Sequence, residues 1–423
     1  MELLNRTAMK QTMRYILILL CGAWCLPLHA AKNVNEEYNR SSLYTITLLH
    51  PKDRMYDHIF ETMQDIPIPD KYEDNSLNLR IINAPNLKGK MLYSPEKMQE
   101  QLTHFMQVNN VGRRMVARWF DRDKKTGAFD TQTLEHRGHY NLSELDLQRS
   151  QYTIAQQVFR ADADEQLIPQ TFVIVNDITY VDKEQNAQTA KVVLNGLAAV
   201  ANAFGGFGSL IHSALQLGAS ISDLIAGFTV DVRSYLFQLD WNEEVANKFY
   251  MDYYYPADAP DLAKKAAFEA DTTTFRMKYI GTYNARSEKT SPRGVHSPAL
   301  VFRKVLTRAL DKNIVELQRE FSIFKVTSMI AGINAKNEAQ VYIGLKEGVN
   351  PNSTYEVLQR EYKNGKLVYR RMATLKPKED MIWDNRYMAV EEQAPNAELG
   401  YTTFTVNNPI GEIVPGMLVR EVK

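Results

Sequence analysis

The sequence predicts an α/β (α+β) N-terminal domain that carries an apolar helical hairpin, followed by a small C-terminal β-barrel-like domain. Three observations lead to this prediction. Apolar strand-like runs and helical patterns follow one another through the first three quarters of the chain, short strands and turns replace them later, and one long stretch has no charged residue. We expect the α/β domain at 32–327, the hairpin within it at 192–222, and the β-rich, SH3-like or barrel-like domain at 328–423.

The composition is that of a globular protein. The chain has 423 residues, with 50 lysine and arginine residues against 50 aspartate and glutamate residues, and 44% of its residues are hydrophobic. This length is typical of two or three domains, and the composition excludes collagen, wholesale disorder and a polytopic helical membrane protein. Because the charges balance and no basic run stands out, no nucleic-acid partner is expected.

Residues 1–31 have the three parts of a secretory signal peptide. Three basic residues precede a short apolar run at 15–24, and the small residues Ala30 and Ala31 close the segment. The run is roughly half of the ~20 residues that span a bilayer, so a retained anchor is less favoured. Cleavage after either alanine removes both cysteines, which leaves no disulfide, thiolate metal site or cysteine nucleophile in the mature chain.

The α/β domain is expected to begin with an apolar strand at Leu43–Leu49. A helix follows, and the prolines of the segment 66–72 must end it. A second strand is expected around 77–82, and the composition of 95–120 is mostly helical. Helical spacing gives that last segment four candidate core positions, which are Met98, Leu102, Phe105 and Val108.

Further along, a helix is expected to start at Asn141–Asp146, and strands at 171–179, 228–233 and 275–283. The most regular element is a later helix with Ser297 as its N-cap and proline at its first turn. Spacings of three and four residues place seven apolar side chains on one stripe of this helix: Phe302, Leu306, Leu310, Ile314, Leu317, Phe321 and Phe324.

The sequence beyond residue 328 is typical of a small β-domain. Five short strands are expected at 340–345, 355–361, 367–374, 402–406 and 417–419. Asn364-Gly365 lies between the second and the third of these and is a strong signal for a type I′ hairpin turn. A barrel-like domain of ~95 residues fits this spacing.

The uncharged segment between Lys191 and Asp223 is the main functional candidate. Its recurring small residues suit close helix packing in a membrane or a tightly packed hairpin in water, and its lack of alternation argues against membrane β-strands. We expect a helical hairpin, broken at 205–208, that is buried or faces a partner; membrane insertion or adsorption is the alternative, and an ordinary loop is the third. The predicted contact surface comprises Leu197, Val200, Phe204, Phe207, Leu210, Ile211, Leu215 and Leu217.

The signals for metal binding and catalysis are weak. Asp121–Gly127 begins like a calcium loop, but Lys125 stands at position five and Gln132 at position twelve, so a solvated turn is favoured. His136 and His139 have a spacing that suits one helix face, but the glycine between them weakens that helix and no acidic partner accompanies them. No cofactor or metal is expected.

Two aromatic segments have a structural and a functional interpretation. Tyr250–Tyr255 fits either a strand edge that covers core or a stacking platform for glycans, and the first is favoured. Arg118-Trp119-Phe120 fits core packing with an arginine that extends to solvent. The glycines at 205–208 lack the pattern of a nucleotide-binding or phosphate-binding loop.

Four blocks, in order, resemble the soluble fold shared by the curli secretion channel family and the lipoprotein activators of penicillin-binding proteins. They are the opening strand, the stretch from Trp119-Phe120 through Gly127-Ala128-Phe129 and Arg137-Gly138 to Ser143-Glu144-Leu145, the strands 171–179 and 228–239, and the helix 298–324. Residues 329–423 look like the small barrel domain that ends some flagellar accessory proteins. The chain departs from the secretion channel because it lacks the lipid-bearing cysteine and has the apolar segment in place of amphipathic membrane strands.

This resemblance implies a non-enzymatic bacterial protein of the periplasm or the outer membrane. The composition, rich in asparagine, lysine and tyrosine with long aromatic runs, also suits an envelope protein of a Bacteroidota-like bacterium. It would act as a scaffold or accessory in outer-membrane assembly or secretion, with another envelope protein, a membrane surface or a second copy of itself as partner. Two alternatives stay open. One is a membrane-inserting oligomer or pore component, and the other is an enzyme that acts on envelope glycans or peptidoglycan through His136, His139 or Asp121.

Overall fold

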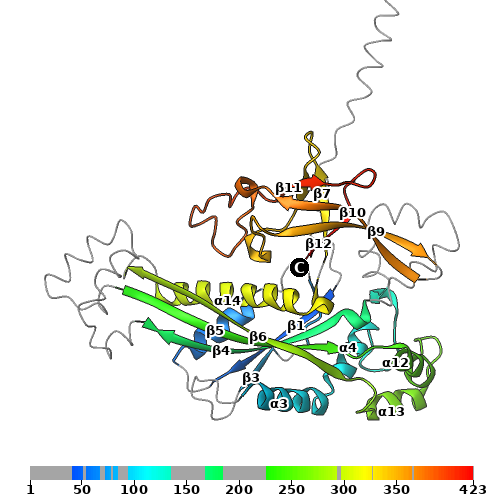
Figure 1. Ribbon diagram of the computed structural model, residues 1–423. Coiled ribbons are helices and arrows are strands. Elements are labelled where there is room, and N and C mark those ends of the chain that lie inside the picture. The colour runs from blue at the N-terminus through cyan, green and yellow to red at the C-terminus, as the bar shows by residue number, and fades with distance from the viewer. Residues whose placement is uncertain are drawn as a thin grey trace, which may run out of the picture. The chain divides into compact units, whose positions relative to one another are not determined.

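The computed structural model describes most of the chain from residue 41 onward. The described residues are 41–50, 54–66, 72–77, 80–83, 94–134, 167–183, 225–292, 297–325, 327–363 and 366–422. They form a six-stranded mixed sheet with helices on both faces and a second sheet of six antiparallel strands (Figure 1). The mixed α/β class that the sequence predicts is therefore confirmed. The predicted signal peptide at 1–31 and the predicted helix at 141–146 lie outside the described residues.

The first sheet has the strand order β2-β1-β4-β5-β6, and β3 also pairs with β1. Its strands are β1 (Ser41–Leu49), β2 (Tyr72–Asp74), β3 (Ile81–Asn83), β4 (Thr171–Asp182), β5 (Ile225–Leu239) and β6 (Met277–Pro292). β1 pairs in parallel with β2, β3 and β4, whereas β4, β5 and β6 pair antiparallel. All four longer strands coincide with predicted ones, although β5 and β6 extend well past the predicted segments.

One face of this sheet packs against α14 (Pro298–Glu320). Ser297 caps this helix as predicted, because its side-chain oxygen accepts a hydrogen bond from the Leu300 amide at 3.2 Å. Five residues of the predicted stripe are buried, four of them within the helix: Phe302, Leu306, Leu310 and Leu317. The helix ends at Glu320, earlier than the stripe implies, and Phe324 is buried instead in the short η5 turn (Ser322–Phe324), against Tyr72 and Phe172.

The opposite face packs against α3 (Pro95–Val108) and α4 (Val111–Trp119). The sequence predicts one helical segment here, but the chain turns at Asn110, whose φ of 48° is left-handed. Val108 was expected in the core and is 62% exposed, whereas Met106 is 2% exposed. That prediction is wrong because Met98, Leu102 and Met106 form the buried row at a spacing of four, which leaves the last turn facing solvent.

Within the described residues, the N-terminal part has five further, shorter helical elements. They are α2 (Tyr56–Asp65), α12 (Glu243–Lys248), the π-helical turn η4 (Phe249–Tyr253) and α13 (Leu262–Ala270), together with the 3₁₀ turn η1 (Ile168–Gln170). α2 ends one residue before the segment 66–72, as its prolines require. Among the described residues, every helix is too short or too polar to cross a bilayer.

The second sheet closes on itself in the order β10-β11-β8-β7-β12-β9. Its strands are β7 (Ser328–Ile333), β8 (Ala339–Val341), β9 (Thr354–Lys363), β10 (Lys366–Pro377), β11 (Thr402–Asn407) and β12 (Leu418–Val422), with the 3₁₀ turns η6 (Leu345–Glu347) and η7 (Glu379–Met381). Lys363 pairs with Lys366 across the predicted hairpin turn, whose residues 364–365 lie outside the described part. β7 was not predicted, because a short apolar run that contains Gly332 gives a weak strand pattern.

Gly112 of α4 provides a test of the contact between this helix and the chain before β6. A Cβ atom at this position would lie 2.6 Å from the carbonyl oxygen of Phe275, which is a backbone atom and cannot move aside cheaply. Alanine favours a helix by about 1 kcal/mol over glycine, but we expect Gly112→Ala to lower stability by about 1–3 kcal/mol through this clash. Thermal and urea unfolding measure the change. Arg118→Ala, at an exposed position of the same helix, is the control and should shift stability by at most about 0.5 kcal/mol. An alanine variant as stable as the parent would contradict the close approach.

Candidate functional site

The predicted contact segment at 192–222, with all eight of its chosen apolar residues, lies outside the described residues. Its two attachment points are described. β4 ends at Asp182 and β5 begins at Ile225, and the two strands pair antiparallel up to Asp182 opposite Phe228. The chain therefore leaves the sheet and returns to it at the same end of one paired ribbon.

Ionic contacts hold the end of this ribbon. Asp182, which is nearly buried, accepts a hydrogen bond from Arg54 at 3.1 Å. Glu288 of β6 accepts from Lys183 and from Thr229, each at 3.2 Å, and these contacts lower the pKa of its carboxyl, with Lys183 as the main cause. The attachment points of the segment are thus fixed to the turn before α2 through Arg54 and to β6 through Glu288.

Of the predicted catalytic candidates, only Asp121 lies within the described residues. Asp121 lies on an exposed turn after α4, and His136 and His139 lie outside the described residues. Asp123, two residues on, uses its carboxylate to accept from the amides of Lys125 and Thr126 and from the Thr126 hydroxyl, which lowers its pKa. This is the hydrogen bonding of a turn. Within the described residues, no three histidine, cysteine or acidic side chains lie close enough to hold a metal ion.

The tyrosines at 250–255 belong to an aromatic core, as the favoured interpretation expected, but they lie in and directly after the π-helical turn η4 and not on a strand edge. Tyr253 and Tyr255 are buried, and Tyr250 and Tyr254 are partly buried against Phe249. The Tyr255 hydroxyl donates to the Thr126 carbonyl at 2.8 Å and so joins this cluster to the turn that follows α4. Trp119 and Phe120 are also buried in the core, while Arg118 is exposed, so the prediction for that segment is confirmed.

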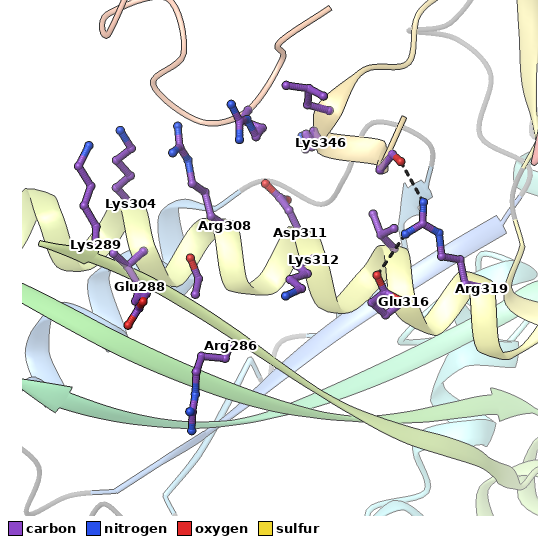
Figure 2. Close-up of a pocket in the computed structure, with 16 residues that line it drawn as sticks. Arg286, Glu288, Lys289, Lys304, Arg308, Asp311, Lys312, Glu316, Arg319 and Lys346 are labelled. Atoms are coloured by element: carbon purple, nitrogen blue, oxygen red, sulfur yellow. Dashed lines mark hydrogen bonds and ion pairs between the residues drawn. The ribbon is translucent and has the colours of Figure 1, made fainter. Parts of the chain in front are cut away.

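A cleft of about 500 Å³ lies between α14, the end of β6 and turns of the second sheet (Figure 2). Most of its charged side chains are basic. Those from the helix are Lys304, Arg308, Lys312 and Arg319, and those from other elements are Arg286, Lys289, Lys346 and Arg386. Only three acidic residues line the same surface, namely Glu288, Asp311 and Glu316. We call this site the basic cleft.

Helix and strand periodicity determine which side chains face the basic cleft. Lys304, Arg308 and Lys312 are four residues apart and therefore lie along one flank of α14. Side chains alternate along β6, so Lys289 faces the helix while Arg286 faces the other side of the sheet, where it pairs with Asp231 at 2.8 Å. Figure 2 shows Lys289, Lys304 and Arg308 extending in the same direction and Arg286 pointing away from them.

Three of these cations share one carboxylate. Glu392, from the segment between η7 and β11, accepts from Lys289 at 2.7 Å and from Arg308 at 3.2 Å, and it also contacts Lys304. Arg308 donates a further hydrogen bond to the Tyr387 carbonyl at 3.2 Å. The ammonium group of Lys304 is almost fully buried, with 4% of its side chain exposed. Burying a charge in this way is unfavourable unless it is fully compensated.

The positive charge around Lys304 is not fully compensated. Arg386 is held by two hydrogen bonds to Asp384, at 2.8 and 2.7 Å, and lies close enough to act on Lys304. The carboxylates near these four cations are Glu392, Asp384 and Asp311, the last of which acts on Arg308, so one positive charge is left over (4 − 3). Burial, followed by Lys289, Arg308 and Arg386, lowers the pKa of Lys304 to about 7. Burial and the neighbouring Arg386 also lower the pKa of Arg308.

At the other end of the cleft, Arg319 is fully paired. Arg319 donates to Glu421 of β12 at 3.1 Å, to Glu316 at 3.2 Å and to the Gly348 carbonyl at 2.9 Å. Its charge is matched by carboxylates, and its contacts connect α14 to the second sheet. Arg319 is therefore structural, whereas the surplus charge is concentrated around Lys304.

The sequence contained a weak signal for this site. Lysine and arginine at 304, 308 and 312 recur every fourth residue on the predicted helix, a pattern that usually marks a solvated face. Lys289, Lys346 and Arg386 come from distant parts of the chain, and no sequence pattern links them to the helix.

No known family model and no curated protein sequence matches this chain. The resemblance to the secretion channel and activator lipoprotein families therefore stays a prediction. What can be said of function depends on the geometry described above.

Replacing Lys304 with methionine tests whether burial and neighbouring cations lower the pKa of this lysine. The folded protein holds the pKa of Lys304 at about 7, below its ordinary value of 10.5, so the unfolded chain binds one more proton between these two pH values. This group therefore makes wild-type stability rise with pH across that window, and the variant lacks this contribution. We expect Lys304→Met to be more stable than the wild type below pH 7, with a difference that shrinks towards pH 10.5 in urea unfolding. Lys278→Met, at an exposed lysine of β6, is the control. A difference that does not change with pH would contradict the lowered pKa.

Proposed function

We propose that the protein is a non-enzymatic envelope scaffold or accessory protein in outer-membrane assembly or secretion. In this proposal it presents the uncharged segment 192–222, as a helical hairpin, to a protein partner or a membrane surface. One observation carries the proposal. A stretch without lysine, arginine, aspartate or glutamate is inserted between β4 and β5, whose pairing continues to the last residue of β4.

The frame that holds the segment is rigid by its packing. β4 and β5 are buried on both faces of the sheet. α14 covers one face, and α3 and α4 cover the other. A buried polar contact joins them to the helix, because the Asn313 amide donates to the Val232 carbonyl at 2.8 Å and to the Ser234 hydroxyl at 2.6 Å. Ser234 in turn donates to Asn176 of β4. Such a frame supports a role as scaffold, since a contact at the insertion does not require the sheet to rearrange.

Burial of apolar surface is the proposed driving force. Removing apolar surface from water contributes about 25 cal/mol per Å², and a patch of more than a few hundred Å² rarely stays exposed on a monomer. The eight apolar residues predicted for the contact surface would form such a patch if they lie on one side. A protein partner and a membrane both satisfy this requirement, so a membrane-inserting oligomer is the second candidate function.

Changing the apolar residues of the segment tests the proposal. In the test variant, Phe204, Phe207, Leu210 and Ile211 become serine, and in a matched control the polar residues Asn195, Asn202, Ser209 and Ser213 of the same segment become alanine. We expect the serine variant to leave the membrane or complex fraction of cells that express the full chain, and the alanine control to remain there. Circular dichroism and thermal unfolding should show an intact frame in both variants.

Two results decide between the alternatives. Leakage from liposomes that depends on the four apolar residues would favour the membrane-inserting oligomer over the protein partner. A serine variant that fractionates as the parent does, with the frame folded, would sink the scaffold proposal in both forms.

A further inference from the structure

The basic cleft is not used by the proposed scaffold function. We propose that it binds a ligand that carries two adjacent phosphate groups, either a soluble diphosphate ester or the diphosphate headgroup of an envelope lipid. The site comprises the Lys304 flank of α14, Lys289 of β6, and Lys346 and Arg386 from turns of the second sheet (Figure 2).

The surplus of charge sets the ligand class. A ligand that takes the place of the Glu392 carboxylate faces four cations and two remaining carboxylates, Asp384 and Asp311. The cations then exceed the carboxylates by two (4 − 2), so a ligand with a single negative charge would leave one positive charge uncompensated. A diphosphate concentrates at least two negative charges in a compact group with several acceptor oxygens. Arginine guanidinium groups donate paired hydrogen bonds to such oxygens, and lysine ammonium groups act as point charges. Arg308 supplies the first kind of donor and Lys289 and Lys304 the second, while Arg386, whose paired donors are held by Asp384, adds positive charge nearby.

The dimensions of the cleft agree with this class. Its volume of about 500 Å³ lies within the usual range for small-molecule sites. Lys304 and Lys312 are eight residues apart on α14, which corresponds to about 12 Å at a helical rise of about 1.5 Å per residue. This row is longer than one phosphate group. Lys312 lines the cleft and has no ion-pair partner among the described residues, so it extends the site beyond the cluster at Lys304.

Glu392 occupies the position that an anionic ligand would take. Its carboxylate contacts Lys289, Lys304 and Arg308, so it acts as an internal competitor for the same cations. The chain segment that carries it has three non-glycine residues with left-handed φ values, which are 62° at Met388, 51° at Gln393 and 64° at Asn396. This backbone conformation is unfavourable for residues other than glycine, so the segment is held in place by its contacts. A diphosphate that offers more charge can displace the Glu392 carboxylate.

Calorimetric titration of the full chain with inorganic pyrophosphate tests the site. We expect saturable binding that weakens as salt is added, because the contacts are ionic. Arg308→Gln should weaken binding by at least about tenfold, since it removes a charge-assisted donor. Lys278→Gln, at an exposed lysine of β6 outside the cleft, is the matched control and should bind as the parent does. Absence of pyrophosphate binding, or equal binding by a folded Arg308→Gln variant, would overturn the proposal.

Two further variants keep the test decisive if Arg308→Gln fails to fold. Lys346→Gln changes a partly exposed residue on the second sheet and should weaken pyrophosphate binding. Glu392→Gln removes the competing carboxylate and should strengthen binding several-fold, a gain that no general loss of folding can produce. If Lys346→Gln leaves binding unchanged and Glu392→Gln weakens it, the site is refuted.

Co-flotation of the protein with lipid vesicles distinguishes a lipid headgroup from a soluble diphosphate ester as the ligand. Phosphatidylcholine vesicles with and without a polyprenyl diphosphate are compared, and the Arg308→Gln variant is included. Cleft-dependent binding to the diphosphate vesicles, competed by pyrophosphate, supports a lipid headgroup, and pyrophosphate binding without vesicle binding supports a soluble ester. Because the serine variant of segment 192–222 retains the cleft, its pyrophosphate binding separates failure of this site from failure of the scaffold proposal.

Discussion

The packing of α14 on β4 and β5 is the contact on which the rest of the described structure depends. Its apolar side covers strands that are far apart in the sequence, with Phe302 and Leu306 against the part of the sheet that leads to the insertion and Leu317 against its other end. The buried amide of Asn313 fixes the helix along the strands, because sliding the helix would leave this amide without its two acceptors, the Val232 carbonyl and the Ser234 hydroxyl. The helix therefore has one defined position over the sheet.

That position also creates the basic cleft. Once the apolar side faces the sheet, the flank with Lys304 and Arg308 must face the second sheet, where Glu392 and Arg386 lie. Because α14 contacts the first sheet on one side and turns of the second sheet on another, some of its charged residues are partly buried. A surface helix that packs on one sheet alone would expose them to solvent. The lowered pKa of Lys304 is the consequence of this arrangement. Arg319 balances its own charge with Glu421 and Glu316, so the same helix has a structural end and a charged end.

Sequence patterns predicted most of the sheet and the long helix, for identifiable reasons. β1 and β4 are buried over most of their length and therefore appear as apolar runs, and the capped stripe of α14 has a clear helical period. β2 and β7 were missed because each is short and lacks a marked alternation. The break at Asn110 was missed as well, since two consecutive helices with continuous apolar spacing look like one until the chain direction is known.

The sequence by itself determined the mixed α/β class, the N-cap at Ser297, the β9–β10 hairpin and the uncharged segment at 192–222, because each of these is written in residues that are neighbours along the chain. Only the tertiary structure decided which cations meet. Lys289, Lys304 and Glu392 are 15 and 88 residues apart (304 − 289 and 392 − 304), and no local periodicity relates them. Charge compensation is a property of distances in space, so the surplus at Lys304 becomes visible only when helix, strand and turn are packed together.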